Sequence, residues 1–196
     1  QGRVNGGMLN VARIVDLAMN NGIDRLTGKQ LGLQTGKPED FKTFDELFEA
    51  VRKQMDFMLK HQVINAMIVD FVQRENTPHL FLSSLIDGCI DNGKDMTWGG
   101  SKWGATPILM AGLATAANSL TAVKHQVFDL KKLDMKKLNE ILDGNFEGAD
   151  GVKLQTELLN EPKYGNDNDY ADEVMCKLTD MFFEEIEKHK DIDGRN

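Results

Sequence analysis

Few residues in this sequence have the types and the spacing of a metal-binding or catalytic site. Oxygen-bearing side chains alternate from Asp143 through Asn145 to Glu147, with Gly148 at the sixth position, as at the front of a calcium-binding loop. The twelfth position, where a bidentate glutamate is required, is Leu154, so we expect no calcium there. The four histidines share no metal-ligand spacing, and we expect surface or capping roles for them: His61, His79, His125 and His189.

The two cysteines do not have the sequence setting of reactive thiols. Cys89 and Cys176 fall in different predicted helices rather than on an exposed turn, and no other thiol lies near either of them in the sequence. We therefore expect two buried structural thiols, with no disulfide and no metal pair.

The composition excludes several classes of partner. The 196 residues are 41% hydrophobic, which is enough to bury the core of one domain. A net charge of -8 and a pI near 5.0 oppose the binding of phosphate backbones, so we expect no nucleic-acid partner. No apolar run approaches the roughly 20 residues that span a bilayer, and residues 1–10 show no signal-peptide pattern, so we predict a cytoplasmic protein without a membrane contact.

Hydrophobic periodicity predicts a mostly helical chain with one or two short strands. A Thr43 and Glu46 capping box should start the longest helix, whose apolar face runs from Leu47 to Phe71. A turn-rich connection precedes it at residues 22–40, and an irregular loop with a short strand is expected at 94–106, before a second strand at 107–110. No composition shift marks a domain boundary, so residues 1–196 are treated as one unit. The other predicted helices cover 8–21, 77–93, 111–128, 134–142, 152–159 and 170–188.

Residues 160–173 are more specific than a connecting loop needs to be. They read Asn-Glu-Pro-Lys-Tyr-Gly-Asn-Asp-Asn-Asp-Tyr-Ala-Asp-Glu and lead directly into the last amphipathic segment. The acidic residues should occupy the first turn of that helix, where free backbone amides and the helix dipole favour negative charge. Local physics thus predicts a helix cap and no ligand site.

Five ordered blocks, this one included, resemble the glycyl radical enzymes of the pyruvate formate-lyase-like family. The others are residues 10–22, 77–89, 97–100 and 114–124. The resemblance implies that the chain is an interior part of the pyruvate formate-lyase-like domain, which is a ten-stranded α/β barrel. It also implies a radical stored on a glycine and passed to a cysteine at a loop tip. Neither residue has a match here, since Cys89 and Cys176 do not fit the cysteine motif, so we expect this segment alone to be inactive.

The resemblance implies the partners and the reaction of a longer parent chain. These are a small organic substrate, a radical S-adenosylmethionine activating enzyme that installs the glycyl radical, and a homodimer. The reaction would break or form a C–C, C–O or C–N bond, as in lyases, decarboxylases and dehydratases. This segment itself is expected to bind no cofactor and to contribute only part of the pocket wall.

Three residues are the candidates for that wall: Asn5, Trp103 and Thr106. The diol dehydratases of the family place an acidic residue near position 5, and an amide there cannot act as a carboxylate base, which disfavours diol dehydration. Many members have Tyr-Asn where this chain has Trp103 and Gly104, which favours a substrate with an aromatic or apolar part. Packing is an equally good explanation of Trp103.

A second function class stays open. The segment could be a helical fragment or an interaction module without catalytic activity. The parent gene discriminates between the two: an enzyme requires the cysteine motif upstream and the glycine motif downstream in one reading frame.

Overall fold

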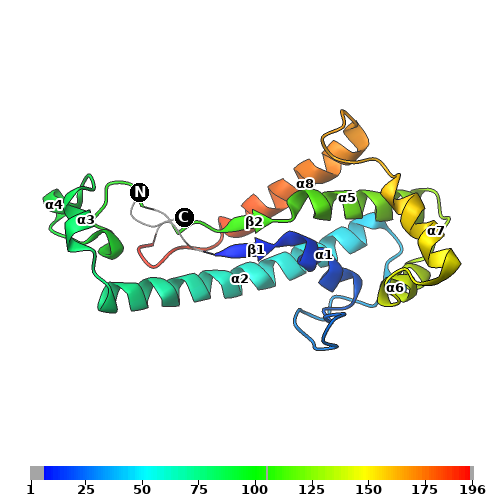
Figure 1. Cartoon of the computed structure of the whole chain (residues 1–196), viewed down its shortest axis with the longest axis horizontal. Coiled ribbons are helices and arrows are strands. Elements are labelled where there is room, and N and C mark those ends of the chain that lie inside the picture. Colours follow the sequence, from blue (N-terminus) through cyan, green and yellow to red (C-terminus); the bar gives the residue numbers. More distant parts are fainter. Residues whose placement is uncertain (1–6, 105, 195–196) are drawn as a thin grey trace. The chain divides into compact units, whose positions relative to one another are not determined.

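Helices make up most of the structure, a computed structural model that describes residues 7–104 and 106–194 (Figure 1). Two short strands, β1 (Met8–Asn10) and β2 (Leu109–Ala111), pair in parallel, and the Leu109 amide donates a 2.9 Å hydrogen bond to the Gly7 carbonyl. The predicted class, mostly α with one or two short strands, is confirmed. Two strands do not make a barrel, so the ten-stranded barrel stays an expectation.

The described residues form two compact units. The first comprises those within 1–9, 58–110 and 184–196, and the second comprises residues 10–57 and 111–183. The prediction of a single domain over residues 1–196 stays a prediction. Eight α-helices are present in the described residues: α1 (Val11–Met19), α2 (Phe44–Asn76), α3 (Leu80–Ser84), α4 (Cys89–Asn92), α5 (Leu113–Val123), α6 (Met135–Asp143), α7 (Gly148–Leu159) and α8 (Asp169–Ile186). Two 3-10 turns, η1 (Pro38–Asp40) and η2 (Met96–Trp98), and a π-helix, η3 (Lys124–Asp129), complete them.

The first helix is shorter than predicted. Residues 8–10 form β1, and α1 begins only after Asn10, whose side chain accepts a 3.1 Å hydrogen bond from the Arg13 amide as an N-cap. The predicted stop at Gly22 is confirmed: its φ is +77° and its amide donates to the Leu17 carbonyl at 2.7 Å. The expected helix over 8–21 was therefore wrong at its start.

The long helix α2 has the start that was predicted. The Glu46 amide donates to the Thr43 hydroxyl at 3.3 Å, and the Glu46 carboxylate accepts from the Thr43 amide at 3.2 Å. The apolar face is fully buried at Leu47 and Met55, but Phe71 is 56% exposed. The predicted face therefore holds for the first half of the helix and was wrong at Phe71.

The predicted helix over residues 77–93 is two short helices, α3 and α4. Gly88 separates them with a φ of +92°, a left-handed conformation that cannot continue a helix. The N-cap of α3 is His79 rather than the predicted Thr77. Periodicity alone suggested one helix because the apolar spacing continues across this break.

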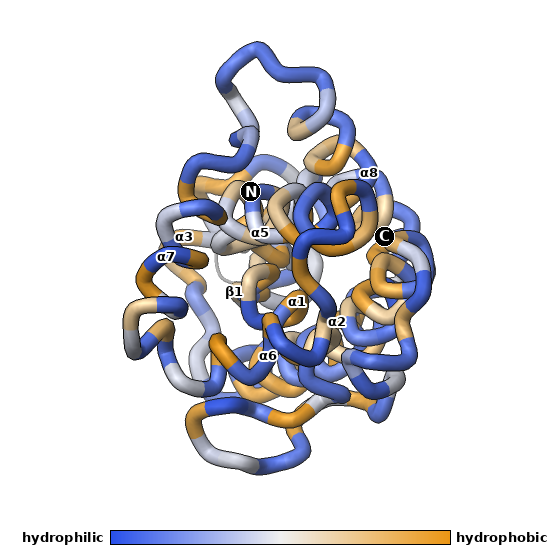
Figure 2. The backbone as a smooth tube through the Cα atoms, turned by 90° about the vertical axis from the view of Figure 1, so that its right-hand side faces the viewer, coloured by the Kyte–Doolittle hydropathy of each residue, from blue (hydrophilic) through white to orange (hydrophobic). Residues whose placement is uncertain are grey.

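The second unit has a dense apolar core. Side chains of α1, α5 and α8 fill it, and Figure 2 shows hydrophobic and hydrophilic residues alternating along the helices, as two-faced helices require. None of the helices in the described residues combines the length and the apolarity of a bilayer-spanning helix. The most buried core residues, each 2% exposed or less, include Ile14, Leu17, Leu120, Leu178 and Met181.

The segment over residues 111–128 and the start of α8 can also be compared with their predictions. The helix expected over residues 111–128 is α5 followed by η3, whose wider turns are rare and are found preferentially at functional sites. The first turn of α8 contains Asp169 and Asp172, as predicted for the acidic segment before it.

Candidate functional site

Thr106 is held in place by a buried carboxylate. Its hydroxyl donates a 2.9 Å hydrogen bond to Oδ2 of Asp70, which lies on α2 and is only 4% exposed. A buried carboxylate needs hydrogen-bond donors, so this bond satisfies part of that need and fixes the orientation of the hydroxyl. Thr106 lies three residues before β2, and both residues belong to the first unit.

A cavity of about 80 Å³ lies beside Thr106 in the same unit. Since one water occupies about 30 Å³ of liquid volume, the cavity could hold a few waters but not a substrate. Its lining mixes apolar and titratable side chains: Val63, Ala66, Met67, Thr106, Ile108, Ile186, His189, Lys190 and Asp191. By itself, the cavity can therefore position water or one polar group.

Of the other two predicted wall residues, one is exposed and one lies outside the described residues. Trp103 is 73% exposed and does not line the cavity beside Thr106. Asn5 lies outside the described residues, so its predicted role stays a prediction. The structure thus gives a partner to Thr106 and leaves Trp103 open to solvent.

Asp95 organises the loop that leads to Trp103. Its carboxylate accepts hydrogen bonds of 2.7 to 2.9 Å from the His79 amide, the Ser83 hydroxyl, and the Thr97 amide and hydroxyl. Burial raises the pKa of this carboxyl, but the donors at Thr97, Ser83 and His79 outweigh burial and lower the pKa overall. A charged Asp95 therefore holds the start of α3 and η2 together.

The two cysteines differ in environment. Cys89 is buried, and burial, followed by the negative charge of Asp95, raises the pKa of its thiol, so it stays protonated at neutral pH. Cys176 is exposed, so the prediction of two buried thiols was wrong for this residue. It lies beside the α8 face that Val174, Met175 and Leu178 bury. Neither thiol is at a loop tip, so neither fits the radical-carrying cysteine of the family.

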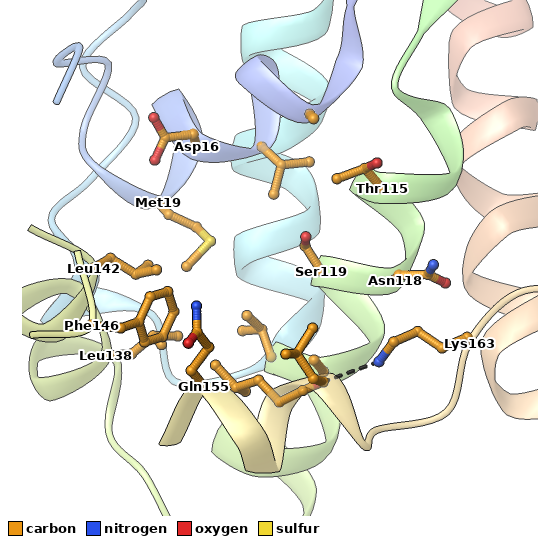
Figure 3. Close-up of a pocket in the computed structure, with 16 residues that line it drawn as sticks. Asp16, Met19, Thr115, Asn118, Ser119, Leu138, Leu142, Phe146, Gln155 and Lys163 are labelled. Atoms are coloured by element: carbon orange, nitrogen blue, oxygen red, sulfur yellow. Dashed lines mark hydrogen bonds between the residues drawn. The ribbon is translucent and has the colours of Figure 1, made fainter. Parts of the chain in front are cut away.

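A larger cavity of about 480 Å³ lies in the second unit, where no pattern in the sequence had indicated one (Figure 3). Apolar side chains from α1, α5, α6 and α7 surround it, among them Met19 and Leu138, together with Phe146 from the turn between α6 and α7. Its one carboxylate, Asp16, is hydrogen-bonded to Arg25 at 2.6 Å, and Lys163 donates to the Leu158 carbonyl at 3.1 Å. Because its charged groups are already engaged, the lining suits apolar contact rather than acid–base chemistry.

The segment over residues 160–173, whose last five residues begin α8, is bound to η3. The Glu161 carboxylate is hydrogen-bonded to His125, and the Tyr170 hydroxyl donates to Asp129 at 2.6 Å. A surface or capping role was wrong for His125, whose ring is half-buried in this contact. Across the described part of the chain, no three His, Cys, Asp or Glu side chains gather into a metal site.

Comparison of the sequence with known proteins supports the family resemblance. The family model for pyruvate formate lyase-like proteins matches residues 1–196. The trans-4-hydroxy-L-proline dehydratase of Clostridioides difficile is 38% identical over 92% of this chain. The (2S)-3-sulfopropanediol dehydratase of Klebsiella oxytoca is 30% identical over 93% of it.

Solved structures agree with the sequence comparison. The hydroxyproline dehydratase of Clostridioides difficile superposes with a TM-score of 0.90 at 36% identity, over 96% of this chain and 24% of that one. The glycerol dehydratase of Clostridium butyricum gives a TM-score of 0.89 at 34% identity over the same shares. The chain spans 23% of the hydroxyproline dehydratase sequence and 22% of the sulfopropanediol dehydratase sequence. With its whole length matched by the family model, this chain belongs to the pyruvate formate lyase-like family of glycyl radical enzymes.

Proposed function

We propose that this chain is part of a longer glycyl radical enzyme that breaks a C–O, C–C or C–N bond in a small organic substrate. The observation that carries the proposal is the 38% identity to a radical dehydratase over 92% of the chain. In such an enzyme the organic glycyl radical supplies the abstraction of a hydrogen atom. The residues described above would shape and seal part of the pocket, which protects reactive intermediates from side reactions.

Dehydration of a small hydroxylated substrate is the first candidate reaction. The dehydratases of hydroxyproline and sulfopropanediol, both similar to this chain, act on compounds of that kind. We infer that Thr106, oriented by Asp70, contributes a hydrogen bond to the substrate, and that Asn5 is a second polar contact. Neither residue is a general base, so the base would come from another segment of the parent.

An aromatic or apolar substrate is the second candidate. The exposure of Trp103 favours it, because the 73% exposed indole is available as an apolar wall. Decarboxylation or another lyase reaction would then replace dehydration. The packing role for Trp103 requires that a further segment cover the indole.

The partners of the parent follow from the same proposal. They are a radical S-adenosylmethionine activating enzyme, which installs the radical, and a second subunit in a homodimer. We place the parent in the cytoplasm, with neither nucleic acid nor membrane as a partner.

The longest reading frame that contains this chain provides the test. The protein would be purified anaerobically, treated with an activating enzyme, and examined by electron paramagnetic resonance. We expect a glycyl doublet, and a parent without one would favour the non-catalytic module. Conversion of trans-4-hydroxy-L-proline, a diol and an arylacetate would then separate the two substrate classes.

A matched pair of variants tests the role of Thr106. We expect Thr106→Val to lower kcat/KM by roughly tenfold, because one substrate hydrogen bond is lost, while the glycyl doublet keeps its intensity. The control is Thr77→Val, whose hydroxyl donates to the Gln73 carbonyl on the exposed surface. Equal kinetics for the two variants would remove Thr106 from the substrate site.

A further inference from the structure

The second unit has another cavity, of about 470 Å³. None of the predicted site residues, Asn5, Trp103 and Thr106, lines it. It lies where the η1 turn meets the segment from η3 to the start of α6, two elements that contact each other. Ligand pockets for small molecules typically measure about 300 to 1,000 Å³, so the volume suits a small organic compound. The residues that line it are Pro38, Glu39, Phe41, Lys42, Val127, Phe128, Lys131, Lys132, Leu133, Asp134, Met135 and Lys136.

Lysine dominates the charge of this lining. It contains four lysines and two carboxylates, although the whole chain has a net charge of -8. Within residues 7–104 and 106–194, no ion pair involves Lys131, Lys132 or Lys136. Like charges gathered in this way repel one another, and a bound anion would relieve that repulsion.

The remaining charged groups of the lining are already oriented by local contacts. The Lys42 ammonium donates to the Glu39 backbone carbonyl at 2.8 Å, which leaves its positive charge without a carboxylate. The Asp134 carboxylate accepts a 2.8 Å hydrogen bond from the Lys137 amide as the N-cap of α6. The two carboxylates of the lining, Glu39 and Asp134, both repel an anion, and four lysines outnumber them.

Apolar side chains cover the rest of the cavity surface. Phe41 and Phe128 contribute aromatic rings that are only half-buried, and Met135, the first residue of α6, is buried. Half-buried rings can stack on a planar apolar group. Lys131 has a φ of +52°, a left-handed conformation that is uncommon for lysine and that is often retained at binding sites.

We propose that this cavity binds a small organic phosphate, with its planar or apolar body against Phe41 and Phe128 and its phosphate among the lysines. Lysine ammonium groups serve as point charges for phosphate oxygens, and four lysines line this cavity against two carboxylates. The class of ligand follows from the two parts of the lining, the lysines and the aromatic rings. An inorganic anion would make no contact with the rings, and a neutral aromatic compound would leave the charge of the lysines unneutralised.

Calorimetric titration with AMP of the protein from the longest reading frame that contains this chain tests this site. We expect saturable binding that weakens by tenfold or more in Lys131→Gln/Lys132→Gln, since two phosphate contacts are lost. The matched control is Lys53→Gln/Lys60→Gln on the exposed surface of α2, which changes the net charge equally and should change the affinity less than twofold. Circular dichroism of both variants would establish that the helices are intact.

Partial ligands separate the two halves of the cavity. We expect inorganic phosphate and adenosine each to bind at least tenfold more weakly than AMP, because each uses one half of the lining. Absence of saturable AMP binding would overturn the proposal, as would equal losses in the two double variants or an affinity for phosphate equal to that for AMP.

Discussion

Glu161 and His125 share a hydrogen bond of 2.5 Å between Oε2 and Nδ1, although 36 residues separate them in the sequence. The Gln126 amide nitrogen donates to the other carboxylate oxygen, so both oxygens of a residue that is 8% exposed have partners. The contact joins the loop over residues 160–168, which precedes α8, to the π-helix η3. This loop is therefore a docking element as well as the cap of α8.

Removing the Glu161 carboxylate should destabilise the second unit. We expect Glu161→Ala to lower the free energy of unfolding by about 2 to 3 kcal/mol, because the Gln126 amide would be left buried without an acceptor. Urea denaturation followed by circular dichroism measures the change. The control, Glu157→Ala, removes an exposed carboxylate 4.0 Å from Lys153 and should cost less than about 0.5 kcal/mol. Equal costs would contradict a docking role for Glu161.

The Tyr170 and Asp129 pair should make stability depend on acid pH. The hydrogen bond from Tyr170, helped by Lys124 and opposed by burial, lowers the pKa of Asp129 below its ordinary value of 3.8. A lowered pKa means that the contribution is complete above pH 3.8 and is lost as the pH falls through the folded-state value.

Tyr170→Phe isolates that contribution. We expect it to cost about 0.5 to 1 kcal/mol at pH 7, a modest figure because Asp129 is partly exposed, and the difference from the unmodified chain should shrink below pH 3.8. Urea unfolding at several pH values measures it. Tyr164→Phe is the control, since only the backbone amide of that residue is seen to hydrogen-bond. A cost for Tyr170→Phe that does not vary with pH would exclude the Asp129 carboxylate as its source.

Gln54 should stabilise the connection over residues 22–40, which precedes α2. Its fully buried amide accepts from the Leu33 amide at 2.9 Å and donates to the Leu33 carbonyl at 2.6 Å, in the manner of a strand partner. We expect Gln54→Ala to cost about 1 to 3 kcal/mol, because the Leu33 amide and carbonyl lose their partner and the buried Gln54 site is left empty. Thermal unfolding would show it, with Lys53→Ala on the exposed face as a control that stays within about 0.5 kcal/mol. An unchanged midpoint for Gln54→Ala would mean that water replaces the amide.

Two glycines with similar backbones should tolerate alanine differently. Gly93 has a φ of +59°, and no neighbouring atom lies within 4 Å of the place that a Cβ would take, so Gly93→Ala should cost about 1 kcal/mol from the backbone alone. At Gly88, with a φ of +92°, a methyl group would lie 2.6 Å from the Lys102 amide nitrogen. Gly88→Ala should therefore cost about 3 kcal/mol or more. Similar unfolding midpoints for the two variants would show that residues 100–102 can move away.

Local signals in the sequence predicted most of the helices. The Thr43 and Glu46 capping box and the Asp134 N-cap have short-range mechanisms, so their positions could be read directly. Strand β1 was missed because three residues are too few to show a two-residue period before α1 begins. The break at Gly88 was missed because apolar periodicity continues through it.

The site was less predictable than the fold. Family resemblance proposed Asn5, Trp103 and Thr106 as site residues, and this proposal stays a prediction. The hydrogen-bond partner of Thr106, Asp70, is 36 residues away, and no local pattern in the sequence indicates their contact. The contact between His125 and Glu161 was equally unpredictable, because it depends on how η3 and the 160–168 loop meet. Cavities depend on several helices at once, so neither lysine spacing nor hydrophobic pattern revealed the pocket beside η1.

The π-helix η3 has a consequence for how this segment tolerates insertions and deletions. Each wide turn accommodates one more residue than an α-helical turn, so deleting one residue within Lys124–Asp129 would restore ordinary helical spacing. The side chains on one flank would then rotate by about 100° relative to the other. A deletion between Gln126 and Asp129 would turn Asp129, which accepts from Tyr170, away from the face on which His125 and Gln126 bind Glu161. A single-residue gap in η3 should therefore be matched by a changed residue at position 161 or 170.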